Sequence, residues 1–350
     1  MIHTLRPATS RSWLGQAASA LGLMLCAWVA WLILDWAVWR AVFKPDVMAC
    51  QALQHHGACW GVVVEKMRPI LLGHYPYEQQ WRPITMLAAS ALLCLGAWFA
   101  GWQRAVSGKG LLALLSYLLV ATALMRGGFA GLEAVPFDAW GGLPLTLWLF
   151  LVSLLASTPL AIGLALARRS SHIWLNMPAT ATIELIRGVP LVTLLFMAAF
   201  MLPVLIPQDH PVPLVWRATL ALTLFSAVYM AEVIRGGLQT VAQEQSEAAA
   251  ILGLSWWQTQ RMVVLPQALR AVLPALVGHG IGLLKDSSLV LVVGLHEFTG
   301  GLSLSLGGDP VWRPYYFEAY LAVGMVYALM CLGLSRTGRM LEQRWAKGTH

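Results

Sequence analysis

Four consecutive polar residues lie within an apolar stretch near the C-terminal end of the chain. This tetrad is Lys285-Asp286-Ser287-Ser288, flanked by the apolar residues 283–284 and 289–293. Ionisable groups are costly in hydrocarbon, and those that occur there tend to mark transport pathways or ion pairs within a bundle. We expect the tetrad either to line a polar pathway or to form a structural salt bridge, and its residue types favour neither. His279 could lie on the same face.

A pattern of Glu, two apolar residues, Arg and Gly occurs twice, each time at one end of a long apolar stretch. The copies are ELIRG from Glu184 and EVIRG from Glu232. A spacing of three places Glu184 beside Arg187, and Glu232 beside Arg235, on one helix face. We expect these charges to lie at a membrane interface or to pair within a bundle, in preference to contacting a transported solute.

Motifs of the common catalytic classes are missing from the sequence. There is no G-x-x-x-x-G-K-[ST] phosphate loop, so the chain cannot bind ATP by that route. H-E-x-x-H, G-x-S-x-G and C-x-x-C are absent too, and the spacing of His55, His56 and Cys59 is poor for a metal site. We expect no catalytic residue, no metal and no cofactor in this chain.

Residues 246–270 predict a small helical unit that is too polar to cross a bilayer. Ser246 can serve as an N-cap, and Gly253 fits the C′ position that ends a first helix. Ser255 with Gln258 three residues later is a capping box that begins a second helix. The pattern predicts a helix, a tight turn and a helix at the membrane surface, with Pro266 at the foot of the next span.

The first of these helices has the side chains of a segment that inserts into another protein. Glu247 lies in its first turn, and Ala248, Ala249 and Ala250 add almost no bulk, which suits a helix-in-groove contact. The alternative is a helix lying on lipid, which would carry Lys or Arg on its polar face. None occurs between Gly236 and Arg261, so we favour the protein partner.

Composition places the chain among integral membrane proteins. Of its 350 residues 58% are hydrophobic and 11% charged, with a mean hydropathy of +0.67. The long continuous apolar stretches favour an all-α polytopic fold over a closed barrel. At about 20 residues per span we predict eight transmembrane helices, at residues 18–40, 84–102, 110–126, 143–167, 189–207, 214–234, 270–294 and 316–335. The net charge of +7 is spread over loops, and nucleic acid is not an expected partner.

The distribution of Lys and Arg predicts that both termini face the cytoplasm, because basic residues are more frequent in the loops on that side. Residues 246–270 are then cytoplasmic, and residues 43–83 form a long outer loop. We expect two regions: residues 1–138, an extension with three spans and the outer loop, and residues 139–345, a core with five spans and most of the motifs.

Two of the five cysteines, Cys50 and Cys59, lie in the predicted outer loop. In a bacterium this loop would face the oxidising periplasm, where disulfides persist. A Cys50–Cys59 disulfide and two free thiols are both open. We interpret Cys26, Cys94 and Cys331, which lie in spans, as small packing residues.

Several motifs, in order, resemble those of permease subunits of ATP-binding-cassette importers. Glu247-Ala248-Ala249 with Gly253 and Leu265-Pro266 resembles their EAA loop. Over residues 139–345, GGLPLTL, ELIRGVPL, YMAEVIRGGL, LPQALR and LLKDSSL are similar to the polar amino acid subfamily, which includes histidine and glutamine permeases. GACW from Gly57 and YPYEQQWRP from Tyr75 resemble the front half of general L-amino acid permeases, and RGVPLVTLLFM is similar to their M-type subunit.

This resemblance implies a type I importer transmembrane domain with an N-terminal extension, in the bacterial inner membrane. It implies two permease subunits, here a heterodimer with a related Q-type subunit, two ATPase subunits that use ATP, and a periplasmic amino acid binding protein. Membrane lipid surrounds the permeases. The residues that would couple to the ATPase are Glu247, Ala248, Ala249, Gly253, Leu265 and Pro266.

The sequence departs from the family pattern at two places. Residues 242–245 read AQEQ and lack the Gly of the turn that usually precedes the EAA motif. Gly278 stands where the family often has Asn, seven residues before Lys285, which favours a substrate pocket contributed mainly by the partner permease.

Two other function classes fit the sequence less well. A secondary transporter would need discontinuous helices, paired midplane carboxylates and internal repeats of several spans. A membrane-embedded enzyme would need one of the missing catalytic constellations.

Overall fold

The computed structural model describes residues 13–53, 56–100, 108–205 and 211–347. Across these residues the backbone is helical, with two isolated β-bridges and no longer strand. The predicted all-α class is therefore confirmed. The first helices are α1 (Trp13–Leu34), η1 (Asp35–Trp39), α2 (Val47–Ala52), α3 (Gly61–Glu65), α4 (Met67–Leu72), η2 (Tyr77–Gln79), α5 (Trp81–Ala100), α7 (Gly108–Arg126) and η3 (Phe137–Ala139).

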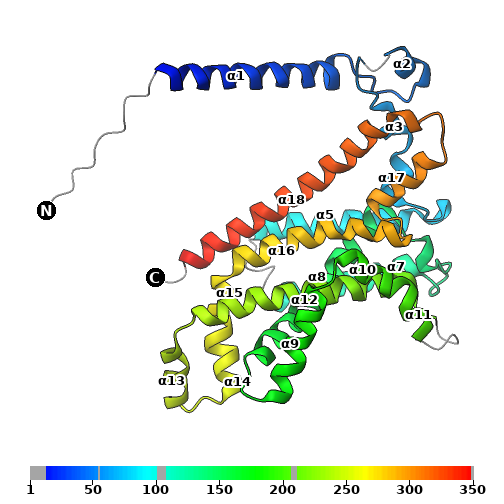
Figure 1. Cartoon of the computed structure of the whole chain (residues 1–350). Helices are drawn as coiled ribbons and strands as arrows, with labels where there is room; N and C mark the ends of the chain where they lie inside the picture. The colour runs from blue at the N-terminus through cyan, green and yellow to red at the C-terminus, as the bar shows by residue number, and fades with distance from the viewer. Residues whose placement is uncertain (1–12, 54–55, 101–107, 206–210, 348–350) are drawn as a thin grey trace. The chain divides into compact units, whose positions relative to one another are not determined.

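The remaining helices begin at residue 142 and are labelled in Figure 1. Its first elements are α8 (Gly142–Arg168), α9 (Ile173–Arg187), α10 (Leu191–Phe196), η4 (Met197–Met201), α11 (Leu202–Leu205) and α12 (Leu214–Thr240). They are followed by α13 (Gln243–Ile251), α14 (Trp256–Thr259), η5 (Gln260–Val264), α15 (Leu265–Ala271), α16 (Leu273–Asp286), η6 (Ser287–Val293), α17 (Phe298–Gly307), η7 (Arg313–Tyr315) and α18 (Tyr316–Lys347).

Seven helical segments of the described chain are long and apolar enough to cross a membrane. These are Gly15–Trp39, Tyr77–Phe99, Gly108–Arg126, Gly142–Arg168, Leu214–Thr240, Leu273–Val293 and Arg313–Gln343. They correspond to seven of the eight predicted spans. Residues 101–102 and 206–207, at the ends of two predicted spans, lie outside the described residues.

The remaining predicted span, residues 189–207, is helical over Leu191–Leu205 but does not form a separate long helix. It is the second arm of a bent pair, in which Ile173–Arg187 and Leu191–Leu205 meet at 103°. The bend has a local cause, because Pro190 is in an extended conformation and disfavours helical geometry at the preceding Val189. The count is eight spans only if this pair crosses as one.

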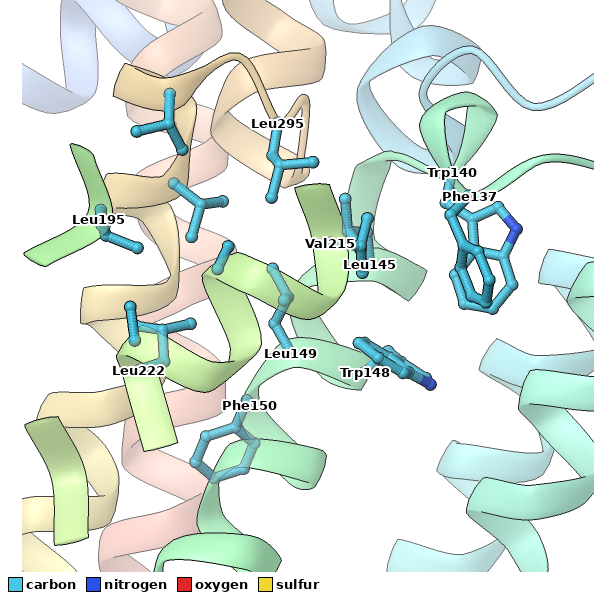
Figure 2. Packing of buried hydrophobic residues seen from close by; sticks show 14 of the residues in the cluster. Phe137, Trp140, Leu145, Trp148, Leu149, Phe150, Leu195, Val215, Leu222 and Leu295 are labelled. Atoms are coloured by element: carbon cyan, nitrogen blue, oxygen red, sulfur yellow. The ribbon is translucent and has the colours of Figure 1, made fainter. Parts of the chain in front are cut away.

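The core of the largest compact unit lies where α8 packs against α12. Figure 2 shows Leu145 of α8 beside Val215 of α12, with Leu149 close by, while the Trp148 ring points away from Leu222. The indole Nε1 of Trp148 donates to Thr122 Oγ1 at 2.8 Å, so this fully buried ring leaves no polar atom unpaired. Close packing of this kind holds helices together in lipid, where water does not drive association.

Two compact units divide the chain: residues 1–66 with 309–319, and residues 67–308 with 320–350. In the smaller unit, Cys50 and Cys59 are joined by a disulfide. The division predicted between residues 138 and 139 is a different one and stays a prediction.

Candidate functional site

Helix α13 begins earlier than its sequence signal suggested. It starts at Gln243 after an extended Ala242 that makes no side-chain cap, so the expected N-cap at Ser246 is wrong. Glu244 lies in the first turn and supports the helix dipole there. Glu247 lies one turn later, where its Oε1 accepts a 2.9 Å hydrogen bond from Gln243 Nε2. Side-chain pairs at i,i+4 stabilise this short helix.

The end of α13 is a Schellman motif built on Gly253. The backbone N–H of Gly253 donates to Ala250 O at 3.0 Å, and that of Leu254 donates to Ala249 O at 3.1 Å. Gly253 has φ +77°, a conformation that glycine adopts without strain. The C′ position predicted from the sequence is therefore present, and it sets the tight turn between the two helices.

Helix α14 begins with the predicted capping box. Ser255 Oγ accepts from the Gln258 N–H at 3.4 Å, and the Ser255 N–H donates to Gln258 Oε1 at 2.8 Å. Helical backbone continues through η5 into α15, whose first turn contains Pro266. Leu265 packs against a second hydrophobic cluster, which includes Ala161, Ile183, Val228 and Ala268. This packing joins α13 and α14, which we call the hairpin, to the helix bundle.

The exposed surface of this hairpin is more apolar than the alanine motif alone indicated. Ala249 is buried against the chain itself, so only Ala248 and Ala250 are available to a partner. α13 packs against α14 and η5, and the pair extends beyond α12 and α15 (Figure 1). Five large apolar side chains are exposed between the end of α13 and η5: Ile251 at 87%, Leu252 at 80%, Trp256 at 62%, Trp257 at 58% and Met262 at 66%.

We call these five side chains the hairpin patch. Sequence reasoning missed it, although large apolar residues on both sides of Gly253 in a polar unit were a usable signal. Exposed apolar patches of this kind mark contact sites for proteins or lipid.

Charges at the ends of α8, α9 and α12 form one network centred on Arg168. Its Nη2 lies 2.6 Å from Glu184 Oε1, and its Nη1 lies 2.7 Å from Glu232 Oε1. Arg235 completes the network, with Nη2 3.1 Å from Glu232 Oε2. The expected Glu232–Arg235 pair is thus formed.

The expected pairing of Glu184 with Arg187 is wrong. Glu184 pairs with Arg168 on α8, while Arg187 approaches Glu232 Oε2 at 3.7 Å and lies over the Tyr229 ring. Helix packing brings α8 beside both α9 and α12, so Arg168 reaches both glutamates. Arg168 of α8 therefore links the two E-x-x-R-G repeats, one on α9 and one on α12.

The polar tetrad divides between two environments. Lys285 and Ser288 line a cavity of about 200 Å³, together with Thr299, Tyr320, Val323, Gly324 and Tyr327. Ser287 is buried and donates to the Leu284 carbonyl at 2.7 Å. Among the described ion pairs none includes Lys285 or Asp286, and both the pathway and the salt-bridge alternative stay predictions.

His279 does not join this cavity lining. Its Nε2 lies 2.9 Å from Ser226 Oγ, which in turn donates to Ser157 Oγ at 3.1 Å. These three residues form a polar contact between α16, α12 and α8.

A fully buried carboxylate, Glu297, lies next to the cavity and was not singled out in the sequence. Its Oε1 accepts from the N–H groups of Thr299 at 2.9 Å and Gly300 at 3.0 Å, which caps α17. Its Oε2 accepts from Thr146 Oγ1 at 3.0 Å and from the Tyr327 hydroxyl at 2.8 Å. Burial raises the pKa of Glu297, and the four donors oppose that shift. Tyr327 thereby connects this carboxylate to the cavity wall.

Residues 157–347 match the family described as "Binding-protein-dependent transport system inner membrane component". The chain belongs to this family. It is a membrane protein with several spans, as its helices also indicate.

Two relatives of this family member match nearly its full length. The inner membrane amino-acid ABC transporter permease protein YhdY of Escherichia coli is 36% identical, covering 92% of this chain and 88% of the relative. The glutamate/glutamine/aspartate/asparagine transport system permease protein BztC of Rhodobacter capsulatus is 30% identical, covering 95% and 90%.

One solved structure supports the fold of the permease core. It is titled "Crystal structure of an amino acid ABC transporter with histidines", and the match has a TM-score of 0.51 at 32% identity. The match covers 58% of this chain and 92% of the other. The predicted type I importer permease fold is confirmed for the matched part.

Proposed function

We propose that this chain is the permease subunit of an ATP-binding-cassette importer that carries L-amino acids across the bacterial inner membrane. Family membership supports the transport role, and the names of the two long relatives support amino acids as the substrate class. Both termini and the α13–α14 hairpin face the cytoplasm in this proposal.

The hairpin patch is the observation that carries the proposal. The segment from α13, with Glu247 at its middle, through the Schellman turn to η5 holds five apolar side chains out of the bundle. That arrangement fits a groove on a separate ATPase, which binds and hydrolyses ATP in this proposal, since the sequence of this chain contains no phosphate loop. Movement of the hairpin then passes through α15 and Arg168 to α8, α9 and α12, which contact one another.

The remaining partners are a second, related permease and a periplasmic amino acid binding protein. The cavity at Lys285 and Ser288 offers a cation and hydroxyl groups to a solute, as a pathway would require. Lys285 is exposed in the single chain, which suits a pathway completed by the second permease.

Uptake by the complete complex in proteoliposomes tests the proposal. Glu247→Arg places a cation where the hairpin presents an acid, so we expect ATP-dependent amino acid uptake to vanish while membrane insertion is unchanged. Glu65→Arg reverses an exposed acid outside the hairpin and serves as the matched control. Full uptake by Glu247→Arg, or gradient-driven uptake by this chain without an ATPase, would reject the proposal, and the latter would favour a secondary transporter.

A further inference from the structure

The smaller compact unit contains a cavity of its own, distinct from the one at Lys285. It has a volume of about 460 Å³ and lies within the unit formed by residues 1–66 and 309–319. Its walls come from two segments that are far apart in sequence. The lining residues are Cys50, Gln51, Gly57, Pro310, Val311, Pro314, Tyr315 and Glu318.

Several independent contacts hold these two segments together. Lys66 Nζ forms a 2.5 Å ion pair with Asp309 Oδ2. The rings of Trp36 and Phe317 meet at 5.7 Å between centroids. The Cys50–Cys59 disulfide closes the loop that supplies one wall. The cavity is therefore preformed and does not need a ligand to assemble it.

Glu318 is the decisive group in this cavity, because it is a carboxylate only 8% exposed. Its Oε1 accepts one hydrogen bond, from the Cys59 N–H at 3.3 Å. Within the described residues no Lys, Arg or His nitrogen lies within 4.0 Å of it. A carboxylate has room for several hydrogen-bond donors, and the described residues provide Glu318 with one, so a cation in the cavity would find free acceptor positions there.

The other lining residues indicate what kind of molecule would carry this cationic group. Pro310, Val311, Pro314 and the Tyr315 ring provide apolar surface, and the Gln51 side chain provides a further polar group. Cavities of a few hundred Å³ with apolar walls and a few placed polar groups are typical small-molecule sites.

We propose that this cavity binds a small organic cation, a primary ammonium on a short alkyl body, through the Glu318 carboxylate. The ammonium donates to Glu318, and the alkyl chain packs against the prolines and Val311. No residue of the hairpin or of the Lys285 cavity takes part, so this site is independent of the proposed transport function.

Photo-labelling of the full chain in nanodiscs tests the site. The probes are a diazirine-bearing butylammonium and the corresponding diazirine-bearing butanol, which has the same body without the charge. We expect the ammonium probe to label peptides containing residues 50–57 and 310–318 about tenfold more than the alcohol, since a hydrogen bond to a charged group is worth that much in affinity. Unlabelled butylammonium should compete, and butyrate should not.

Two variants test whether the charge of Glu318, and not a change in folding, accounts for the labelling. Glu318→Gln keeps an acceptor for the Cys59 N–H, and we expect it to reduce ammonium labelling to the level of the alcohol. Glu65→Gln removes an exposed carboxylate of the same unit that does not line the cavity, and labelling should persist. An intact Cys50–Cys59 disulfide, checked by thiol alkylation, shows that each variant is folded.

Three results would overturn the proposal. Equal labelling by the two probes would remove the role of charge, and undiminished labelling of Glu318→Gln would remove the role of this carboxylate. Labelling confined to span peptides that contain neither residues 50–57 nor residues 310–318 would indicate partition into lipid. None of these results bears on ATP-dependent uptake, so the proposed function can stand or fall separately.

Discussion

Arg168 of α8 lies 2.7 Å from the Glu232 carboxylate of α12, and the same guanidinium lies 2.6 Å from Glu184 of α9. One side chain therefore fastens three helices at the end of the bundle that carries the hairpin. Hydrogen bonds between ionised groups in partly buried sites are the stronger kind, because water competes less for them.

Replacement of Arg168 should destabilise the bundle more than replacement of its neighbour in the network. We expect Arg168→Met to lower the unfolding free energy by about 1.5–3 kcal/mol, the range for hydrogen bonds to charged groups. Arg187→Met removes a longer contact of 3.7 Å and should lower it by less than about 1 kcal/mol. Denaturant titration in detergent micelles measures both, and equal losses would contradict the central position of Arg168.

Two adjacent glycines of α12 offer a matched test of helix packing. A methyl group at Gly237 would lie 2.6 Å from the Ala268 carbonyl oxygen and 2.8 Å from Val272 Cγ1, whereas one at Gly236 would meet nothing within 4 Å. We expect Gly237→Ala to destabilise the chain by about 1–3 kcal/mol through overpacking. Gly236→Ala should be neutral or stabilising by up to about 1 kcal/mol, because alanine is the better helix former.

The same denaturant titration decides between these two variants. Similar stabilities for Gly236→Ala and Gly237→Ala would show that α12 does not approach α15 as closely as described. ATP-dependent uptake provides a second readout, since the α12–α15 contact lies next to the hairpin. We expect Gly237→Ala to reduce uptake and Gly236→Ala to retain it.

A third prediction concerns pH and the histidine next to Glu297. Burial lowers the pKa of His296 below its ordinary 6.5, and the nearby His74, whose ring centroid lies 5.4 Å away, lowers it further. The unfolded chain then binds a proton more readily than the folded one. Stability is therefore complete above pH 6.5 and falls as the pH drops below it.

Two variants isolate this contribution. His296→Gln should remove the acid-side loss of stability, and His74→Gln should remove part of it. The raised pKa of Glu297 acts with the opposite sign, because it lowers the stability of the fold as the pH rises above 4.5. This effect is shared by the wild-type protein and both variants. The measurement is the unfolding free energy of each variant and of the wild-type protein between pH 5 and 7, compared as a function of pH. A curve for His296→Gln parallel to wild type would refute the assignment.

Local signals explain which parts of this structure could be predicted from the sequence. Ser255, Gln258 and Gly253 act within one turn of their own positions, so the capping box and the helix end were readable. Spans of about 20 apolar residues were readable for the same reason. The missed start of α13 shows the limit, since Ser246 has a good capping side chain but lies inside a helix that began at Gln243.

Contacts between distant segments account for most of the rest. Glu184 has a suitable partner three residues away in Arg187, yet packing brings Arg168 closer from another helix. The burial of Glu297 depends on Thr146 and Tyr327, which lie on other helices. Spacing along one chain carries no information about such neighbours.

The hairpin patch gives the most direct test of the account as a whole. A photo-cross-linker at Leu252, on the outer side of the turn, should capture a nucleotide-hydrolysing subunit when the complex is irradiated in its native membrane. The same group at Leu220, exposed on the membrane-spanning α12, should not capture that subunit. Adducts from Leu252 that contain lipid alone would contradict the claim that this hairpin binds the ATPase.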